Sequence, residues 1–349
     1  MMTLRMFESA PPSLPYITAS YLSDLGVSFG KQMLFTKQSP QRLKMLREHA
    51  LIESAVSSNR IEGVTVDQSR VATLVFGKPL LRDRDEAEVR GYRNALQWIH
   101  EKASSISVSE TNIRRLHALS RGESGDAGKY KKTENDIIEK YPDGRQRVRF
   151  RPVRAAETPA AIREFVERWN GGEKEPAIHP LLLLAASNLD FLCIHPFRDG
   201  NGRVSRLLLL LQSYRLGYEA GRYISLERVI EQNKDRYYET LEQSSHRWHE
   251  GRHDPWPYIN YLLYIFKTAY KEFESRLGQV KSPRGEKTGL VLHAIELAEN
   301  PFRVADLQKQ CPGVGLDWIR ETLKKLKCAG KVECLSRGQN AEWRKTGKW

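Results

Sequence analysis

Residues 195–206, HPFRDGNGRVSR, bring together side chains that could act on a phosphate-containing substrate. His195 can take up a proton near neutral pH, which suits it to the role of a general base. Asp199, four residues later, is a carboxylate of the kind that holds Mg²⁺ jointly with substrate phosphates. The segment therefore predicts a base and a metal ligand close together.

A turn that could bind an anion follows directly. Gly200, Asn201 and Gly202 precede an apolar run, so they are expected to begin a helix whose first backbone N–H groups bind phosphate. Arg203 and Arg206 are three residues apart and share one face of that helix. Guanidinium groups donate in a geometry that suits phosphate oxygens. The pattern predicts two phosphate-binding arginines beside the turn.

Two buried helices are expected to hold this segment in place. Residues 179–194 are nearly all apolar and contain no Gly or Pro after Pro180, which predicts a buried helix. Pro196 disfavours helical geometry at His195, so the histidine is expected at the helix end. Residues 203–215 return to an apolar helical run. Cys193 lies on the apolar helix and is interpreted as a core residue rather than as a partner of His195.

The twelve residues resemble the signature of the Fic (filamentation induced by cyclic AMP) domain family, HxFx(D/E)GNGRxxR, at every fixed position. The resemblance implies a mainly α fold and transfer of AMP from ATP to a Ser, Thr or Tyr hydroxyl of a target protein. The hydroxyl would attack the α-phosphorus, and pyrophosphate would leave. The resemblance implies these roles: base, His195; Mg²⁺ ligand, Asp199; phosphate binding, Gly200, Asn201, Gly202 and Arg203; γ-phosphate binding, Arg206.

A second motif lies near the start of the chain. Residues 40–62 have helical apolar spacing, Ser58 and Glu62 are four residues apart, and Gly63 can end the helix. Alone, this pattern is typical of a solvated helix end. Beside the signature, it resembles the inhibitory motif of the family, (S/T)xxxE(G/N). The resemblance implies that Glu62 pairs with Arg206 and occupies the position of the γ-phosphate.

Further segments could complete such a site. Residues 147–153 alternate charged and apolar side chains, so with the turn 141–146 they predict a β-hairpin, which the resemblance implies is a flap that aligns the target. A plain surface hairpin is the alternative. Lys131 stands where the family usually has Arg, which weakens the assignment of individual flap residues.

A predicted helix over 224–241 carries three residues that could contact the nucleoside. The resemblance implies this role for Asn233, Tyr237 and Tyr238. Tyrosines at helical spacing are also typical of a core, and this alternative stays open.

The composition of the whole chain limits the class of protein. The 349 residues carry a net charge of +13, and the expected organisation is an N-terminal segment with the inhibitory helix (1–75), a catalytic core (76–278) and a tail (279–349). Residues 1–38 are expected to be irregular with little helix, and 281–287 to form a linker. The four cysteines lack metal-binding spacing, there is no long apolar run, and the first residues lack the features of a secretory signal. A cytoplasmic protein without a membrane span is expected.

The tail reads as a winged helix-turn-helix. Helical patterns over 288–300, 303–310 and 315–330 are followed by two short strand patterns within 331–345. Residues 281–349 hold 14 Lys and Arg against 8 Asp and Glu, a balance of +6. This balance favours DNA binding through a recognition helix at 317–327. Docking of a protein or a second copy of the chain is the alternative.

Three functions follow from these patterns. The favoured one is an autoinhibited protein adenylyltransferase that uses ATP and Mg²⁺. A second keeps the same site but also removes AMP, with Glu62 positioning water. The third is a transcriptional regulator that senses ATP and binds DNA through its tail. His195 argues against the third, because a sensor does not need a base.

Overall fold

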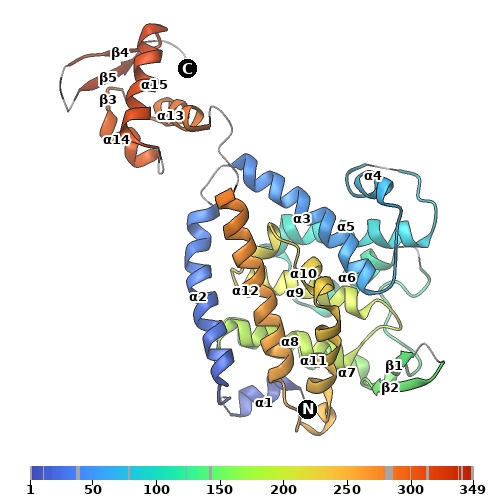
Figure 1. The fold of residues 1–349 in the computed structure, drawn as a ribbon. Coiled ribbons are helices and arrows are strands. Elements are labelled where there is room, and N and C mark those ends of the chain that lie inside the picture. Colours follow the sequence, from blue (N-terminus) through green and yellow to red (C-terminus); the bar gives the residue numbers. More distant parts are fainter. Residues whose placement is uncertain are drawn as a thin grey trace. The chain divides into compact units, whose positions relative to one another are not determined.

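The computed structural model describes residues 2–346 except 11, 37–39, 78, 123, 141–143, 280–285, 299, 312–313, 337 and 339–340. The chain divides into two compact units, Met1–Leu277 and Gly278–Trp349. Figure 1 shows that helices form most of both units, as the sequence predicted. Strands are confined, among the described residues, to one two-stranded and one three-stranded sheet.

Two helices form the centre of the first unit. α8 (Pro180–Ile194) and α9 (Asn201–Arg215) are buried along nearly their whole length, because other helices cover them on several sides. The covering helices are α5 (Arg84–Lys102), α6 (Glu110–Arg121) and α7 (Thr158–Lys174). The two central helices carry the predicted segment 195–206 between them.

The connection between α8 and α9 is short and conformationally restricted. α8 ends at Ile194, and His195 adopts a left-handed conformation with φ of 51°. Pro196 follows and cannot continue the helix. Gly200 has φ of 80°, a value that favours glycine, and it directly precedes α9. The expectation that the histidine lies at a helix end is confirmed.

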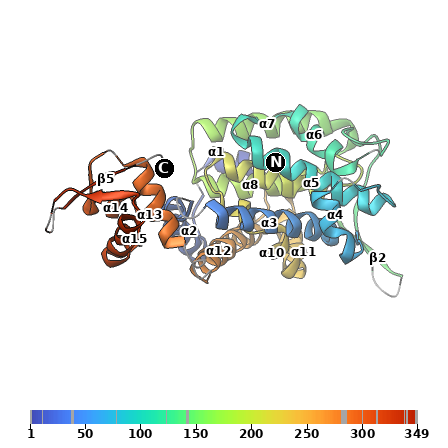
Figure 2. The same ribbon diagram turned by 90° about the horizontal axis from the view of Figure 1, so that it is seen from above.

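α3 (Pro40–Ile61) packs against α5 and α10 (Leu226–Gln232), and Figure 2 shows it between these two helices. Its end brings residues 58–62 beside α9. Gly63 has φ of 84°, and its N–H donates to the Arg60 carbonyl at 3.0 Å, so the glycine ends the helix as expected. α4 (Val71–Phe76) then leads back to α5.

The expectation of little helix over residues 1–38 is wrong. α1 (Thr3–Ser9) and α2 (Tyr16–Thr36) occupy most of this segment, and prolines 12 and 15 lie between the two helices. α2 binds the rest of the unit through buried polar contacts. Thr18 donates to Asn260 at 2.7 Å, and Gln32 donates to the Gly217 carbonyl at 2.9 Å. Tertiary packing therefore outweighs the weak local helix signal.

The segment 224–241 is not one helix. α10 ends at Gln232, and α11 (Lys234–Ser245) begins after Asn233, whose φ is −122°. The Asn233 amide donates to the Val229 carbonyl at 2.9 Å, so the side chain stabilises the end of α10. α12 (Trp256–Gln279) closes the unit. Short 3-10 helices lie at Gln68–Arg70, Ala103–Ser105, Ala155–Glu157, Ala220–Arg222 and Trp248–Glu250.

The predicted hairpin is present. β1 (Ile137–Lys140) pairs antiparallel with β2 (Gln146–Phe150), with Ile138 opposite Val148 and a register shift after Ile137. The predicted turn includes residues 141–143, which lie outside the described residues.

The second unit has its own apolar core, which includes Ile295, Leu307, Ile319 and Leu323. Its elements are α13 (Glu286–Leu297), β3 (Phe302–Arg303), α14 (Val304–Gln310), α15 (Leu316–Cys328), β4 (Val332–Cys334) and β5 (Glu342–Lys345). The three helices and two strands agree with the expected pattern, and β3 adds a third strand in the order β3-β5-β4. Residues 286–287 of the expected linker belong to α13, and 281–285 lie outside the described residues. None of the helices of the described chain is long and apolar enough to cross a membrane.

One buried carboxylate connects the N-terminus to the central helices. Asp190 of α8 accepts hydrogen bonds from the backbone N–H of Thr3 at 2.7 Å and of Leu4 at 3.0 Å, and from the Trp248 indole at 2.7 Å. Because Asp190 is fully buried, these donors have no access to water in its place.

We expect Asp190→Ala to lower the free energy of unfolding of the full chain by about 3 kcal/mol, because it leaves three buried donors without an acceptor. Urea denaturation followed by tryptophan fluorescence measures this change. Asp235→Ala, at an exposed position of α11, is the control and should change the free energy by about 0.5 kcal/mol or less. Equal effects of the two substitutions would contradict this role of Asp190.

Candidate active site

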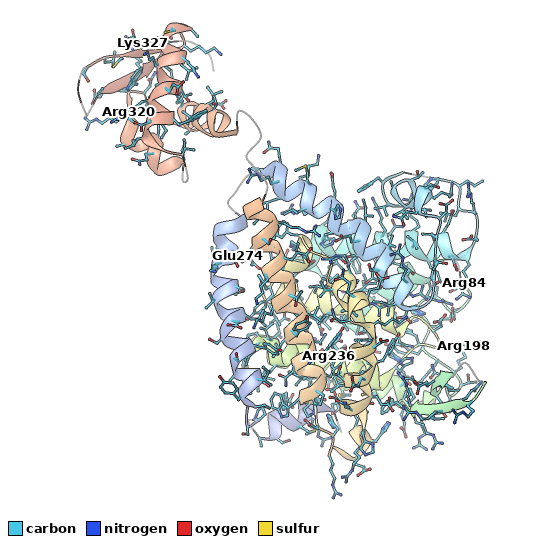
Figure 3. The ribbon with its side chains drawn as sticks, viewed as in Figure 1. Arg84, Arg198, Arg236, Glu274, Arg320 and Lys327 are labelled. Carbon is cyan, nitrogen blue, oxygen red and sulfur yellow. The ribbon has the colours of Figure 1, made fainter. Side chains whose placement is uncertain are left out.

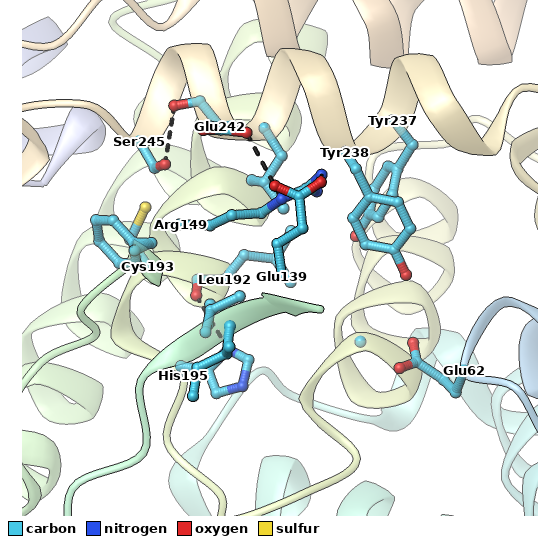
Figure 4. A pocket seen from close by; sticks show the side chains of 15 residues that line it. Glu62, Glu139, Arg149, Leu192, Cys193, His195, Tyr237, Tyr238, Glu242 and Ser245 are labelled. Carbon is cyan, nitrogen blue, oxygen red and sulfur yellow. Dashed lines mark hydrogen bonds and ion pairs between the residues drawn. The ribbon is translucent and has the colours of Figure 1, made fainter. Parts of the chain in front are cut away.

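A cavity of about 470 Å³ lies where α8, α9, α11, the hairpin and the end of α3 meet. His195, Glu62, Gly202, Tyr237 and Tyr238 all line it, so five of the residues predicted from sequence share one cavity. Figure 4 shows Glu62 and His195 at its floor, with the tyrosines and Glu242 coming from α11 above. Ile138, Phe150 and Leu241 contribute apolar walls.

His195 is held so that one ring nitrogen faces this cavity. Its Nδ1 lies 3.4 Å from the Leu192 carbonyl, a contact that places the proton on Nδ1 and leaves the lone pair on Nε2. Burial, aided by the positive charge of Lys131, lowers the pKa of His195 to about 4. The imidazole is therefore neutral at pH 7 and able to accept a proton.

Arg206 of α9 and Glu62 at the end of α3 form an ion pair in the same cavity. The Arg206 Nη2 lies 2.7 Å from Glu62 Oε1, and the Arg206 side chain is 3% exposed while that of Glu62 is 29% exposed. Ser58 holds the guanidinium from the other side. Its hydroxyl accepts from Nε at 2.8 Å, and its carbonyl accepts from Nη2 at 2.9 Å. The predicted pairing of Glu62 with Arg206 is thus present in the structure.

The Glu62 carboxylate also lies against the first turn of α9. A Cβ atom at Gly202 would come within 2.2 Å of Glu62 Oε1, so only glycine leaves room for an anion here. The first N–H groups of a helix have no partner inside it and favour negative charge. Arg206 Nη1 is buried without a hydrogen-bond partner, so a phosphate could satisfy a donor that Glu62 leaves unpaired.

Asp199 is not among the residues that line this cavity and instead lines a second one together with Arg84 and Arg121. Its Oδ2 pairs with Arg121 at 2.7 Å and Arg84 at 3.2 Å, and its Oδ1 accepts from the Gly200 N–H at 2.6 Å. Burial opposes ionisation, but Arg121 and Arg203 outweigh it and lower the pKa of Asp199. Its carboxylate is therefore ionised and half exposed. One such carboxylate together with substrate phosphates fits the needs of Mg²⁺, provided that the exposed Arg84 moves aside.

The side chains of Arg203 and Asn201 differ from expectation. Arg203 Nη1 lies 2.6 Å from Glu88 Oε2, and both side chains are almost fully buried, so this guanidinium is an internal partner of Glu88. The Asn201 side chain closes the loop by hydrogen bonds with the N–H and carbonyl of Phe197 at 2.9 and 2.8 Å. Among these residues, therefore, the backbone N–H groups and Arg206 are left for binding phosphate.

Two of the three residues predicted to contact a nucleoside, Tyr237 and Tyr238, line the cavity. Tyr237 is buried and its ring lies 5.1 Å from that of Tyr238, and both line the cavity. The Tyr238 hydroxyl is 3.5 Å from the Ile61 carbonyl, next to Glu62. Asn233 is used at the end of α10 and is not among the residues that line the cavity.

The hairpin is bound to α11 by charged side chains above the cavity. Arg149 of β2 pairs with Glu139 of β1, and also with Glu242 of α11 at 3.6 Å. Arg147 lies 2.6 Å from the same Glu242. Figure 4 shows Glu139, Arg149 and Glu242 facing one another at one side of the cavity. The hairpin therefore covers the site and is attached at one edge.

Several residues that support the site were not predicted. Glu88 pairs with Arg84 at 2.9 Å and with Arg121 at 2.7 Å. His117 stacks on Phe197 and accepts from the Gly128 N–H at 2.8 Å, so its Nε2–H donates to the Asp199 carbonyl at 3.0 Å. Of these residues, only Glu88 could have been found from the sequence. It is a charged residue one turn before Tyr92 on the buried face of α5, and a charged residue on an apolar helix face indicates a buried partner.

Comparisons with known proteins agree with this arrangement. Residues 107–213 match the model of the Fic/DOC family. The chain is 27% identical over 216 residues to the protein adenylyltransferase Fic of Nematostella vectensis, covering 58% of this chain and 45% of that protein. It is 22% identical over 286 residues to the protein adenylyltransferase Fic of Drosophila melanogaster, covering 74% of this chain and 54% of that protein. The chain spans about half the length of these curated relatives.

Solved structures share the fold. A Fic family protein from Desulfovibrio desulfuricans G20 superposes with a TM-score of 0.63 at 20% identity, covering 97% of this chain and 98% of that one. A Fic domain containing signaling protein from Bacteroides thetaiotaomicron gives a TM-score of 0.61 at 23% identity, covering 73% and 98%. Residues 107–213, which contain the signature at 195–206, thus match the Fic/DOC family model, and the chain shares its fold with solved Fic proteins.

Proposed function

We propose that this chain is an autoinhibited protein adenylyltransferase, which transfers AMP from ATP to a hydroxyl side chain of a target protein. One observation carries the proposal: the neutral His195 and the anion-binding first turn of α9 face the same cavity. A base and a phosphate site at one cavity suit attack by a hydroxyl on a phosphorus atom. The similarity to proteins named protein adenylyltransferase Fic supports the same chemistry.

In the proposed reaction, Nε2 of His195 takes the proton of the target hydroxyl. The hydroxyl oxygen forms a bond to the α-phosphorus, and the bond from that phosphorus to the bridging oxygen of pyrophosphate breaks. The first turn of α9 and Arg206 bind the β- and γ-phosphates and stabilise the charge of the leaving pyrophosphate. The adenosine would lie against Tyr238 and the apolar wall formed by Phe150 and Leu241.

Asp199 would hold Mg²⁺, which supplies charge neutralisation to the triphosphate when bound. Asp199 itself is oriented by the Gly200 N–H, and His117 fixes its backbone carbonyl. We propose that Arg84 leaves Asp199 when the nucleotide binds, because its side chain is 67% exposed while Arg121 is buried.

We further propose that Glu62 inhibits the enzyme by occupying the γ-phosphate position. Glu62 and the γ-phosphate are both anions that need Arg206 Nη2 and the space above Gly202. They cannot occupy it together, because like charges in a buried site repel strongly. ATP would then bind with its α-phosphorus out of line for attack, or would have to displace Glu62.

The second unit supports an additional function. α15 exposes Arg320, Lys324 and Lys327, which are spaced so that they share one helix face, and Figure 3 labels the first and last of these. Trp318 at the start of the helix is 41% exposed. We propose that this basic face binds the phosphate backbone of double-stranded DNA.

We expect Glu62→Gly to raise the transfer of AMP to proteins of a cell lysate at least about tenfold, because the γ-phosphate then gains Arg206. Mass spectrometry of the lysate treated with ATP and this variant reports both the group transferred and the modified residue. Glu48→Ala, an exposed glutamate of the same helix, is the control and should leave the signal unchanged. If Glu62→Gly is as inactive as His195→Ala, the transferase proposal is wrong.

The base role requires a neutral His195, so we expect an NMR titration to give a pKa near 4 for this residue. Lys131→Met should raise this pKa, since removing a nearby positive charge favours the imidazolium. Lys129→Met removes an exposed lysine two residues away and should change it little. His195→Gln identifies the resonance. A pKa near 6.5 that does not respond to Lys131→Met would contradict the described environment.

For the second unit, we expect the logarithm of the association constant for a DNA duplex to fall linearly with the logarithm of the salt concentration. Lys324→Ala with Lys327→Ala should reduce this slope by about 2, because each phosphate contact contributes about 0.9. Fluorescence anisotropy across a salt series measures it, with Lys102→Ala in the first unit as the control. Binding that does not depend on salt would count against phosphate contacts.

A further inference from the structure

A second cavity, of about 700 Å³, is lined by Arg198 and Asp199 of the loop 195–200, whereas the first is lined by His195 of the same loop. Six lysine or arginine residues and two aspartates line it, and it shares Asp199 with the site already described. Figure 3 shows Arg84 and Arg198 projecting on the side of the first unit that carries the hairpin. By contrast, the first cavity is lined by three glutamates and one arginine. The two cavities therefore differ in the sign of their charge.

The wall of this basic cavity is part of the framework that holds the base. The Lys131 N–H donates to the Pro196 carbonyl at 2.9 Å, and the Asn135 amide donates to the carbonyls of Phe197 and Arg198 at 3.1 and 3.2 Å. The chain then continues directly into β1 at Ile137. A peptide segment that reaches His195 beside the hairpin would therefore pass close to this wall.

The charges of the cavity are not balanced internally. Both aspartates already have cationic partners, since Asp199 pairs with Arg121 and Arg84, and Asp126 lies 3.6 Å from Arg121. Lys132 and Arg198 are exposed and make no ion pair with any residue that the structure describes. These two cations come from the two segments that enclose the cavity. They remain available to an external anion.

We propose that this basic cavity binds acidic side chains of the target protein, on either side of the hydroxyl that is modified. The inference rests on the proposed transferase function and adds the chemical class of its target. The phosphates of ATP have their own donors at the first turn of α9 and Arg206, which leaves the cations of Lys132 and Arg198 for another anion. Complementary charge of this kind selects partners and speeds their association.

The test uses the full-length protein and three fluorescent peptides that differ only in the residues around one Ser, namely Glu, Gln or Lys. Fluorescence anisotropy without nucleotide measures binding. We expect the Glu peptide to bind at least about tenfold more tightly than the Lys peptide at low salt. Lys132→Ala with Arg198→Ala should remove most of this difference.

The matched control removes the same charge elsewhere. Lys44→Ala with Lys102→Ala takes two exposed lysines from the first unit, and Lys102 lies about 27 Å from Arg84 along α5 at 1.5 Å per residue. This control should keep the preference for the Glu peptide. The proposal is overturned if both double variants lose it equally, since net charge alone would then explain binding. Displacement of the Glu peptide by equimolar inorganic pyrophosphate would also overturn it, by assigning the cavity to phosphate.

A second readout separates this inference from the transferase proposal. The Glu62→Gly protein is given ATP and the same peptides, and the Km for each peptide is measured. Binding of the Glu peptide without any labelling would refute the transferase and leave the basic cavity as an acidic-peptide site. Labelling of all three peptides with the same Km would refute the basic cavity and leave the transferase.

Discussion

The ion pair between Glu62 and Arg206 is the interaction on which the proposed control of the site depends. A buried guanidinium is costly without an anion, so Arg206 needs a partner in every state of the protein. Glu62 supplies one from the end of α3, where its partial exposure makes it the side of the pair that can leave. A triphosphate offers more oxygens to the same donors. In the proposed mechanism, the contact between Glu62 and Arg206 therefore marks the position of the γ-phosphate and blocks it.

The residues around the ion pair of Glu62 and Arg206 are held in place by packing and by hydrogen bonds. α8 and α9 are buried on most sides, and the loop between them is fixed by Asn201, by the left-handed His195 and by Gly200. Behind the loop, Glu88 holds Arg203 and Arg121 in a nearly dry network. Glu88 thereby compensates the buried charges of both guanidinium groups behind the loop. Glu62 and Arg84 are the more exposed members of their ion pairs with Arg206 and Glu88, so they are the side chains that a nucleotide could displace.

Much of the site could be predicted from sequence because its information is local. The end of α8 at Pro196 and the turn at Gly200 follow from short motifs, whereas the pairing of Glu62 with Arg206, 144 residues apart, was implied only by the resemblance to the family. The ion pair of Arg203 could not be predicted from sequence, because its partner Glu88 lies 115 residues away in the chain. The helices α1 and α2 were missed because buried contacts such as Gln32 with Gly217 stabilise them rather than local propensity. The role of Asn233 stays a prediction, and the hydrogen bond of its amide at the end of α10 could not be foreseen from a pattern that suggested one continuous helix.

The central claim is that Glu62 and ATP compete for Arg206, and isothermal titration of ATP into the protein in the presence of Mg²⁺ tests it most directly. The account predicts that Glu62→Gly binds ATP at least about tenfold more tightly than the native chain, which corresponds to about 1.4 kcal/mol. It also predicts that adding Arg206→Ala to this variant removes the gain. Equal ATP affinity of the native chain and Glu62→Gly, or a gain that survives without Arg206, would contradict the account.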